Sequence, residues 1–553
     1  MAEFAEDELI FLPLGGSGEI GMNMNLYGFA GQWLLVDLGV TFADSDVPGV
    51  DLITPDPTFI ADRRDDLAGL IITHAHEDHL GAVAHLWRRL RCPVWATPFA
   101  GNLLRNKLEE AGLLHEVPLH VIEPGQRLQI GPFSIDFVPL THSTLEMNAL
   151  AIRTDAGLVL HTGDWKLDPE PLVGPGSDQE ALRLLGDEGV MAMIGDSTNA
   201  LIEGTSGSEA EVRDKLLEIC ANRRGRVAVT TFASNVARID TVARVAAANG
   251  RHLVLVGRSL WRILAAARDC GYLQHIAPPL TDDEGGYLPP DKVMFLCTGS
   301  QGEPRAALAR IAAGDHRHVV FEKGDLVIFS SRVIPGNETA IGRVQNRLLW
   351  NGVEVVGEEE GGVHVSGHPC RDELAEMYRL VRPKIAVPVH GEYKHMLAHA
   401  ELARSMQVPE AMVIENGQAL RLEPGGTEVV AEVQSGRCFV DGSVVVPADD
   451  DGIRMRRKLS FSGGGAVILV ANQDGELLAD PELILQGLAT DNGLTSLAEE
   501  GARAVENAVN NLPRLARRDD VRMIEAARIA LRRLIRKRLG KRAVIEARII
   551  RVD

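Results

Sequence analysis

The sequence predicts a mixed α/β protein of two or three domains. At 553 residues the chain is too long for one ordinary hydrophobic core. Short apolar runs separated by turns fill its first part. From about residue 206 helical and strand-like segments alternate, as in a parallel α/β domain. A dense histidine cluster directly follows one buried strand and indicates where the functional site lies.

The first part of the chain is predicted to be mainly β. Its strands are short apolar runs, and several end on a polar residue, so these polar side chains should converge at one edge of a sheet sandwich. The predicted elements are strands at 9–12, 25–27, 33–37 and 70–73, a helix at 82–90, and further strands within 133–164.

The rest of the chain is predicted as α/β followed by a basic C-terminal part. The final helix carries an apolar stripe at 3.6-residue spacing between Met523 and Leu539, which favours a core or oligomer contact over an RNA contact. The predicted helices are 209–221, 235–249 and 259–270, and the predicted strands are 226–231, 252–256, 293–297, 326–330, 353–356 and 385–390.

The charge distribution leaves two readings open. A net charge of −20, taken alone, argues against a polyanionic substrate. Yet residues 223–268 hold nine Arg against one acid, and residues 514–542 hold twelve Lys and Arg against three acids. Such zones can hold a phosphate backbone, or they can be solvated helix surfaces.

The compartment is predicted to be the cytoplasm. No apolar run reaches the roughly 20 residues that span a bilayer. The segment Met1–Glu8 is acidic and lacks the pattern of a signal peptide. The six Cys form no C-x-x-C pair, which favours reduced thiols over a cysteine metal site.

The run Gly16–Gly21 matches the dinucleotide-binding fingerprint by its letters. That fingerprint works only where a helix begins and presents its N-terminus to a pyrophosphate. Residues 22–36 alternate like hairpin strands instead, so we interpret the glycines as a tight turn under the functional site.

The histidine cluster predicts a metal site. Three His and one Asp fall within six positions after a buried strand, a density that is hard to explain structurally. On a loop, His74 and His76 can face one metal while Asp78 and His79 face a neighbouring one. Imidazole with carboxylate suits Zn²⁺, or Mn²⁺ where the carboxylate share is higher.

Two metals need further ligands, and other strand ends offer them. His142, Asp164 and His390 each follow an apolar strand. Asp37 also ends a strand, and it is predicted to accept a hydrogen bond from a metal-binding imidazole.

Taken in this order, the ligand residues resemble those of the metallo-β-lactamase superfamily, and later motifs resemble its β-CASP branch of nucleic-acid nucleases. Residues 14–21 and the layout of the whole chain resemble the bacterial ribonuclease J family. The later motifs are Asp-Ser-Thr-Asn at 196–199 and the runs 297–304, 330–338, 364–368 and 388–393.

This resemblance implies a split architecture. A metallo-β-lactamase αββα sandwich is implied for residues 1–205, returning with a linker at 351–450. A β-CASP α/β domain is inserted at 206–350, and a small C-terminal α/β domain at 451–553 supports a homodimer or homotetramer.

The resemblance also implies the roles of individual residues. One Zn²⁺ takes His74, His76 and His142, and the other takes Asp78, His79 and His390, with Asp164 bridging. His368 is implied as general acid beside Asp196, and Asp37 and Asp78 are counted with the catalytic residues. The implied RNA-binding residues are Phe232, Ala233, Ser234, Asn235, His364, Val365, Ser366, Gly367, His368, Ser331, Arg332 and Asn337; Gly49, Asp51 and Asp441 are implied ligands of a structural Ca²⁺.

The expected activity is a ribonuclease of RNA maturation and decay, since two such cations activate water for attack on a phosphodiester. A 5′→3′ exonuclease that prefers 5′-monophosphate ends is expected, together with endonuclease activity. The donors His364, Ser366 and Ser234 are neutral or weakly basic, and with few cations nearby they suit a monophosphate better than a triphosphate.

Three alternatives stay open from the sequence. A thioesterase or lactonase of the same fold does not need the basic insertion. A DNA-processing β-CASP nuclease tends to carry Val where this chain has His390. An RNA-binding scaffold with an inert site would hold no metal.

Overall fold

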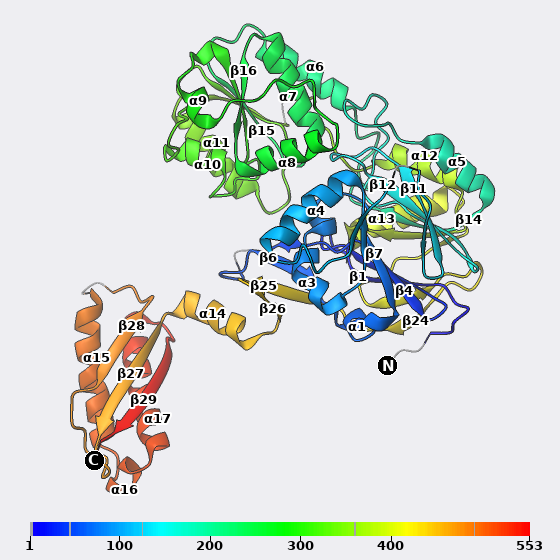
Figure 1. The fold of residues 1–553 in the computed structure, drawn as a ribbon. Coiled ribbons are helices and arrows are strands. Elements are labelled where there is room, and N and C mark those ends of the chain that lie inside the picture. The colour runs from blue at the N-terminus through cyan, green and yellow to red at the C-terminus, as the bar shows by residue number, and fades with distance from the viewer. Residues whose placement is uncertain (1–3, 44–45, 124, 359–360, 491–492, 553) are drawn as a thin grey trace. The chain divides into compact units, whose positions relative to one another are not determined.

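The computed structural model describes residues 4–43, 46–123, 125–358, 361–490 and 493–552. Two compact units result: one comprises Met1–Thr41 and Ile53–Cys438, the other Phe42–Leu52 and Phe439–Asp553. The described part is a mixed α/β structure (Figure 1). Within that part no helix combines the length and the apolar character that a membrane crossing requires.

Two sheets form the sandwich of the first unit. The apolar core that contains Phe11, Ile71, Ile135, Ile152 and Val387 lies between them, with all five side chains buried. One sheet has the order β24-β23-β1-β3-β4-β7-β8-β9 and the other the order β10-β11-β12-β13-β14-β20-β22. The strands are β1 Ile10–Gly15, β3 Met24–Phe29, β4 Gln32–Val36, β7 Leu67–Ile71, β8 Val94–Ala96, β9 Leu119–Val121, β10 Leu128–Ile130, β11 Phe133–Pro139, β12 Asn148–Thr154, β13 Gly157–His161, β14 Val190–Asp196, β20 Ile385–Val389, β22 Glu410–Ala411, β23 Gln418–Arg421 and β24 Glu428–Glu432.

Helices cover the outer faces of this sandwich. The second sheet buries a separate core that contains Leu182, Leu374 and Leu402 from three helices. On the first sheet, the helix Pro98–Glu110 (α4) packs against β8 and β9, so the arrangement has four layers, α, β, β and α. The helices of this region are α1 Thr58–Ala61, α2 Glu77–Leu80, α3 Val83–Leu90, α4 Pro98–Glu110, α5 Gln179–Glu188, α12 Arg371–Val381 and α13 Tyr393–Ser405.

One strand pairing in the second sheet joins distant parts of the sequence. β20 lies parallel to β14, with Ile194 opposite Val387 and Asp196 opposite Val389. The carboxyl ends of these strands therefore share one sheet edge, and residues near 196 and near 390 become neighbours.

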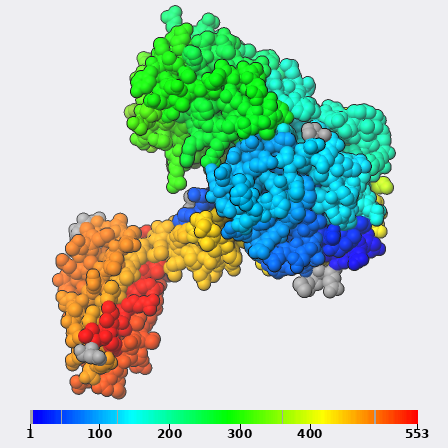
Figure 2. All heavy atoms as spheres, in the orientation of Figure 1, coloured from blue at the N-terminus to red at the C-terminus, as the bar shows by residue number. Residues whose placement is uncertain are grey.

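The inserted segment between them forms its own lobe of the first unit, drawn in green in Figure 2. Its five-stranded parallel sheet has the order β16-β17-β15-β18-β19. The predicted helices and strands of this lobe are confirmed to within one residue at each end. The elements are α6 Glu209–Cys220, β15 Val227–Thr230, α7 Val236–Ala248, β16 His252–Val256, α8 Arg258–Asp269, α9 Asp282–Gly286, β17 Val293–Cys297, α10 Ala307–Ala313, β18 Leu326–Phe329, α11 Glu338–Trp350 and β19 Glu354–Val356.

The second unit contains a three-stranded sheet of order β28-β27-β29. The apolar stripe of the last helix packs in its core, where Met523, Ala527, Leu531 and Ile535 are fully buried. The basic segment is two helices rather than one, because Asp519 caps the second through the N–H of Val521. The elements are α14 Asp451–Ser462, β27 Gly464–Ala471, β28 Glu482–Gln486, α15 Gly493–Asn510, α16 Arg514–Arg517, α17 Asp520–Leu539 and β29 Val544–Arg551.

The unit boundaries differ from the predicted domain ranges, which divided the chain after residues 205, 350 and 450. The segment Phe42–Leu52 groups with residues from Phe439 onward. The reason is a four-stranded sheet of order β26-β25-β6-β5 that joins early and late segments of the chain. Its strands are β5 Thr41–Phe42, β6 Leu52–Pro55, β25 Arg437–Asp441 and β26 Val444–Pro447.

The Gly-rich run near the N-terminus is a turn. Gly16, Gly18 and Gly21 have φ values of 89°, 81° and 104°, a left-handed conformation that favours glycine. β2 Ser17–Gly18 pairs with β21 Gly391–Glu392 instead of opening a helix. The run therefore lacks the geometry of a dinucleotide site and lies against the segment that carries His390.

Candidate active site

The histidine loop leaves the carboxyl end of β7 and enters the short helix α2, which begins at Glu77. Gly39 permits this path, because a Cβ there would lie 1.7 Å from the carbonyl oxygen of Asp78. The Gly39 backbone N–H in turn donates to the Asn23 carbonyl. The loop is thus fixed against the neighbouring strand ends.

Two ligand clusters form at this sheet edge. In each, one ligand atom per residue lies within 4.8 Å of all the others. Both contain Asp164, which therefore lies between them. The first cluster is His74, His76, His142 and Asp164, and the second is Asp78, His79, Asp164 and His390.

The ring nitrogens of the first cluster are close to one another. His76 Nδ1 lies 3.2 Å from His74 Nε2 and 3.0 Å from His142 Nε2. In the second cluster, Asp164 Oδ2 lies 3.1 Å from His79 Nε2 and 3.4 Å from His390 Nε2. Asp78 Oδ2 completes that cluster, 3.7 Å from His390 Nε2.

Outer hydrogen bonds orient four of the five imidazoles. His79 Nδ1 lies 2.7 Å from Asp37 Oδ2, and His142 Nδ1 lies 2.6 Å from the Gly367 carbonyl. His390 Nδ1 lies 2.9 Å from Asn23 Oδ1. These oxygens are acceptors, so each Nδ1 carries the proton.

His74 follows the same rule through a hydroxyl. Its Nδ1 lies 3.0 Å from Thr73 Oγ1, whose own proton goes to Asp37. The lone pairs of four Nε2 atoms consequently point into the site. Such outer partners commonly fix the tautomer of metal-binding histidines.

Burial keeps most of these rings uncharged. It lowers the pKa of His74 and of His142 well below the ordinary value, and it lowers that of His76 to about 4. His79 differs: burial lowers its pKa, but Asp164, Asp37 and Asp78 together raise it well above the ordinary value. Neutral imidazole is the form that ligates metals.

The donor set fits metal ions. Asp164 Oδ1 and His390 Nε2 are buried and have no hydrogen-bond partner in the described part of the chain. Buried polar atoms rarely stay unpaired. Converging lone pairs and unpaired acceptors are what a cation would satisfy, and nitrogen with carboxylate donors suits Zn²⁺ or Mn²⁺.

Two of these residues have strained backbones. Asp37 and His390 have φ values of 62° and 51°, in the left-handed region. Non-glycine residues there cost on the order of 1–3 kcal/mol each, and such strain concentrates at functional sites. In this conformation the His390 backbone N–H donates a hydrogen bond to the Gly16 carbonyl at 2.6 Å.

His368 lies beside both clusters. Its ring is 5.1 Å from that of His142 and 5.7 Å from that of His390, measured between centroids. His368 Nδ1 lies 2.8 Å from Asp196 Oδ2. Burial lowers the pKa of His368, but Asp196, with Asp164 and Asp78, raises it to about 9.

The loop 364–368 is packed tightly against the first cluster. A Cβ at Gly367 would lie 2.8 Å from His142 Cε1 and 2.9 Å from Ser143 Oγ, so this position needs glycine. Ser366 Oγ accepts from Asn199 Nδ2 at 2.8 Å and from the His368 backbone N–H at 3.1 Å. Its own hydroxyl proton has no acceptor within the described part of the chain and can donate to a ligand.

His364 lies near three cations, which differs from the expectation of few cations. Burial, together with Arg238, Arg332 and Lys166, lowers its pKa to about 3. Two of the cations are committed, because Arg238 pairs with Glu209 at 3.1 Å and Lys166 pairs with Asp168 at 2.9 Å. The residues of both ion pairs are distant from His364 in the sequence, so the sequence around His364 does not show which cations lie near it.

Arg332 is the third cation. Its Nη1 donates to Asn199 Oδ1 at 2.6 Å, and among the described residues it has no acidic partner. Gln301 Nε2 donates to the Arg332 carbonyl, while Gln301 Oε1 accepts from Asn337 Nδ2 at 3.2 Å. Arg332 therefore brings an uncompensated charge to the loops around His364.

The remaining predicted binding residues lie at turns of the inserted lobe and in the 364–368 loop. Asn235 caps α7, where its side chain accepts from the Arg238 N–H, and Phe232, Ala233 and Ser234 precede this cap. Ser331 is buried after β18. Val365 packs at Gly207, whose added Cβ would lie 2.9 Å from a Val365 methyl.

The arginine-rich zone at 223–268 is not a free cationic surface. Seven of its nine arginines are bound within the described chain to carboxylates or to backbone carbonyls. They are Arg223, Arg226, Arg238, Arg244, Arg251, Arg262 and Arg268. Most of its charge is therefore already paired within the protein.

The three candidate Ca²⁺ ligands do not fit a cation. Arg456 donates to both oxygens of Asp441, at 3.0 and 2.6 Å, and to the Pro48 carbonyl at 3.3 Å. A Cβ at Gly49 would lie 2.9 Å from the same guanidinium. Asp51 joins no group of three ligands among the described residues. An arginine thus neutralises Asp441 where the resemblance implied Ca²⁺.

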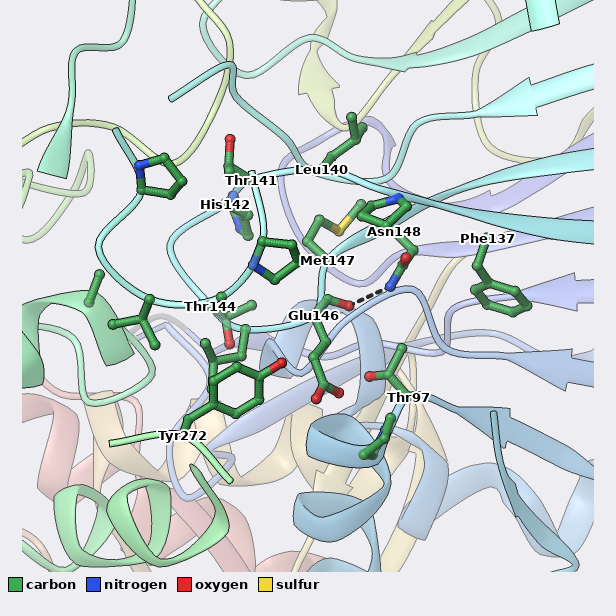
Figure 3. A pocket seen from close by; sticks show the side chains of 18 of the residues that line it. Thr97, Phe137, Leu140, Thr141, His142, Thr144, Glu146, Met147, Asn148 and Tyr272 are labelled. Carbon is green, nitrogen blue, oxygen red and sulfur yellow. Dashed lines mark hydrogen bonds between the residues drawn. The ribbon is translucent and has the colours of Figure 1, made fainter. Parts of the chain in front are cut away.

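A cavity of about 180 Å³ lies at the loop between β11 and β12, which carries His142 (Figure 3). Its walls are mostly apolar, and His142 lines one side. Figure 3 shows the Tyr272 hydroxyl facing the Glu146 carboxylate. Burial, with Glu146 nearby, raises the pKa of Tyr272 to about 12. Four acids and no Lys or Arg line the cavity, so it does not suit a phosphate.

Sequence reasoning missed several positioning residues. Asn23 holds His390 and also donates to the Asp78 carbonyl at 3.1 Å. Thr73 and Asn199 lie in the sequence runs 70–73 and 196–199, but nothing in these runs predicts a role for either side chain. Their amide and hydroxyl groups connect segments far apart in the chain, and no local spacing signals such contacts.

Family models match most of the chain. They are described as beta-lactamase superfamily domain over residues 32–176, ribonuclease J beta-CASP domain over 224–348, Zn-dependent metallo-hydrolase RNA specificity domain over 353–412, and ribonuclease J C-terminal domain over 452–552.

Curated relatives match over nearly the whole length. A ribonuclease J of Sinorhizobium meliloti is 46% identical over 552 residues, which covers 99% of this chain and 98% of the relative. A ribonuclease J of Mycobacterium tuberculosis is 36% identical and covers 98% and 96% of the two chains. A solved protein of unknown function from Enterococcus faecalis has a TM-score of 0.51 at 15% identity, covering 75% of this chain and all of that one, which shows a shared fold.

Asp37→Asn should weaken metal binding. The change leaves His79 Nδ1 and Thr73 without their carboxylate acceptor, and loss of such an outer partner typically costs about 10- to 100-fold in metal affinity or activity. Competition with a chromogenic chelator measures the affinity. Asp136→Asn, which alters a carboxylate bound to Arg127 and Arg153, is the control. Equal affinity of the two variants would contradict the assigned role.

Proposed function

This chain belongs to the ribonuclease J family of metal-dependent ribonucleases, and we propose that it hydrolyses RNA with two Zn²⁺ ions, as a 5′→3′ exonuclease that prefers 5′-monophosphate ends and also cuts internally. Family membership sets aside the thioesterase and lactonase alternative. The observation that carries the proposal is the pair of ligand clusters sharing Asp164, with His368 and Asp196 beside them.

Each ligand cluster would hold one cation. His74, His76 and His142 would hold one ion, Asp78, His79 and His390 the other, and Asp164 both. When bound, two such cations lower the pKa of water toward about 7 and offset charge that develops on phosphorus. Asp37, Asn23 and Thr73 keep the ligand rings oriented.

His368 would protonate the leaving 3′ oxygen. Its Nδ1 proton is held by Asp196, so in the acid form Nε2 carries the proton that is transferred. Asp196 thereby fixes the ring and favours its charged form. His368 adjoins both clusters, where a scissile phosphate would lie.

The loops around His364 would bind the 5′ phosphate. Neutral His364 and the Ser366 hydroxyl can donate hydrogen bonds, and Arg332 supplies one uncompensated charge. The other two cations are already paired with acids. A triphosphate adds roughly two more negative charges that lack counter-charges, and burying unpaired charge is costly.

A homodimer or homotetramer through residues 451–553 is also proposed. Family membership supports it, as does the exposure of Ile484 and Ile550, at 48% and 53%, on strands β28 and β29. Light scattering of the full chain tests this assembly, and a monomer at working concentration would contradict it.

The metal content should be about two transition-metal ions per chain. Chelation should abolish RNA cleavage, and Zn²⁺ or Mn²⁺ should restore it. Asp78→Ala should reduce the metal content and lower the cleavage rate by more than the about 10- to 100-fold typical of an outer partner, while the protein stays folded. Active protein without metal by elemental analysis, or normal cleavage by Asp78→Ala at full metal load, would refute the site.

The 5′ end should decide the mode of degradation. RNA with a 5′ monophosphate should be degraded processively, and RNA with a 5′ triphosphate should not, although internal cuts occur in both. Arg332→Gln, or Ser366→Ala with His364→Ala, should reduce exonuclease rates more than internal cutting. Arg223→Gln, which alters an arginine paired with Glu354, is the control. Equal exonuclease rates on both 5′ ends would show that the pocket does not discriminate.

The pH profile should report His368. Its raised pKa of about 9 means that the acid form is present below that pH and is lost as the pH rises through it. Bound cations lower this pKa, so the alkaline limb of kcat should fall at or below about pH 9. Asp196→Asn should shift the limb to lower pH, because the carboxylate that favours the charged ring is gone. An unchanged limb in Asp196→Asn and in His368→Ala would contradict the assignment.

A further inference from the structure

We propose that His399 is a positioning residue for RNA cleavage, because its hydrogen bonds to Ser197 and Tyr378 fix the loop that carries Asp196 and, through Asp196, the ring of His368. The proposal rests on the proposed role of His368 as general acid. His399 itself contacts neither ligand cluster. His399 belongs to α13, and its buried side chain points toward the end of β14.

A buried chain of three polar side chains passes through His399. Its Nδ1 lies 3.0 Å from Ser197 Oγ, and its Nε2 lies 2.8 Å from Tyr378 Oη. The exposed fractions of Ser197, His399 and Tyr378 are 0%, 0% and 3%. Three segments, the end of β14, α13 and α12, are thereby joined at one point.

The imidazole ring also packs against the backbone on the other side of Asp196. A Cβ at Gly195 would lie 3.1 Å from His399 Cε1, closer than an ordinary van der Waals contact. His399 thus contacts Gly195 through packing and Ser197 through a hydrogen bond. These two residues flank Asp196, so the ring constrains the backbone on both sides of that carboxylate.

The same loop reaches the reacting groups through its other residues. Asp196 accepts from the Thr198 N–H at 2.8 Å and holds the His368 ring. Asn199 Nδ2 donates to the His368 carbonyl at 3.0 Å and to Ser366 Oγ at 2.8 Å. A displacement of the loop would therefore move His368 by its ring and by its backbone together.

The loop also touches the metal centre. Thr198 Oγ1 donates to the His390 carbonyl at 3.1 Å. His390 already has a left-handed backbone, so its position depends on such contacts. Metal content is therefore measured in every loop variant, so that a displaced His368 can be told from a disturbed metal centre.

A histidine suits this position because both ring nitrogens are used. A neutral ring donates at one nitrogen and accepts at the other, so it can satisfy two buried hydroxyls at once. Burial lowers the pKa of His399 to about 4, and an uncharged ring leaves the negative charge of Asp196 available to His368. A phenylalanine would fill the space, but the Tyr378 hydroxyl would lose its ring partner, and the Ser197 hydroxyl would keep only the Gly195 carbonyl, at 3.4 Å.

The test compares leaving groups. One RNA carries a 5′ monophosphate and an ordinary 3′ oxygen at the first linkage, and the other carries a bridging 3′ sulfur there. A thiolate leaves without a proton, so cleavage of the second RNA does not need the general acid. His399→Phe and Ser197→Ala should lower kcat on the ordinary RNA by at least about 10-fold, a part of the about 10²- to 10⁴-fold that general acids supply. KM and metal content should stay unchanged, and cleavage of the sulfur-bridged RNA should be nearly normal.

Four further variants make the result specific. His399→Asn keeps a polar atom near the Nδ1 position and should restore part of the rate. His399→Phe combined with Ser197→Ala should cost little more than either change alone, since both break the same link. Tyr378→Phe should have a smaller effect than either. Leu402→Ala disturbs the same helix and core without touching the loop, and should lower the Tm while keeping the ratio of the two rates.

The outcomes separate this proposal from the function on which it rests. An equal loss on both RNAs in His399→Phe and Ser197→Ala, or a loss that follows the metal content, would overturn the positioning role. His368→Ala is the reference, and it should lose cleavage of the ordinary RNA alone. If His368→Ala loses both equally, the general-acid assignment fails, and the His399 proposal fails with it.

Discussion

The structure depends on one buried carboxylate. Asp164 belongs to both ligand clusters, and one of its oxygens has no partner in the described chain. Neighbouring His390 and His79 hold its pKa well below the ordinary value against the opposing effect of burial. A charge so deeply buried requires compensation, which bound cations would complete. The sandwich brings residues from 74 to 390 to one sheet edge where that compensation is assembled.

Further hydrogen bonds and ion pairs surround the ligand clusters. Each ligand ring except His76 gives its second nitrogen to an acceptor, and Asp37 serves both His79 and Thr73. Farther out, the buried pairs Lys166–Asp168 and Arg238–Glu209 neutralise charges beside the 364–368 loop. Removing one partner of such a buried pair costs about 3–5 kcal/mol. Among the described residues these pairs leave Arg332 as the cation near His364 without an acidic partner, and the proposed site for a single phosphate rests on this imbalance.

Loop 196–199 connects these groups. It holds the His368 ring, the Ser366 hydroxyl, the His390 carbonyl and the buried His399 ring with four consecutive residues. The proposed general acid, the proposed phosphate site, the ligand clusters and the helical core thus meet in one short segment. The inserted lobe interrupts the chain between this loop and residues 364–390, yet the parallel pairing of β14 with β20 restores their proximity.

The sequence by itself determined the elements and the ligands. The alternation of apolar runs placed the helices and strands of the inserted lobe to within one residue, because period and turn chemistry are local properties. The density of His and Asp after one strand predicted four metal-ligand candidates, since few structural roles need such a cluster, and polar residues at other strand ends added three more. The Gly16–Gly21 turn could be told from a nucleotide site by the strands that follow it.

Only the tertiary structure decided which charges are free. The nine arginines of residues 223–268 look like an RNA surface in the sequence, but seven are bound to acids or carbonyls. Asp441 looks like a cation ligand until Arg456 is seen to hold it. No sequence pattern predicts a role for His399 or Asn23. The physical reason is that pairing and desolvation depend on neighbours distant in sequence, whereas pattern and propensity depend on neighbours along the chain.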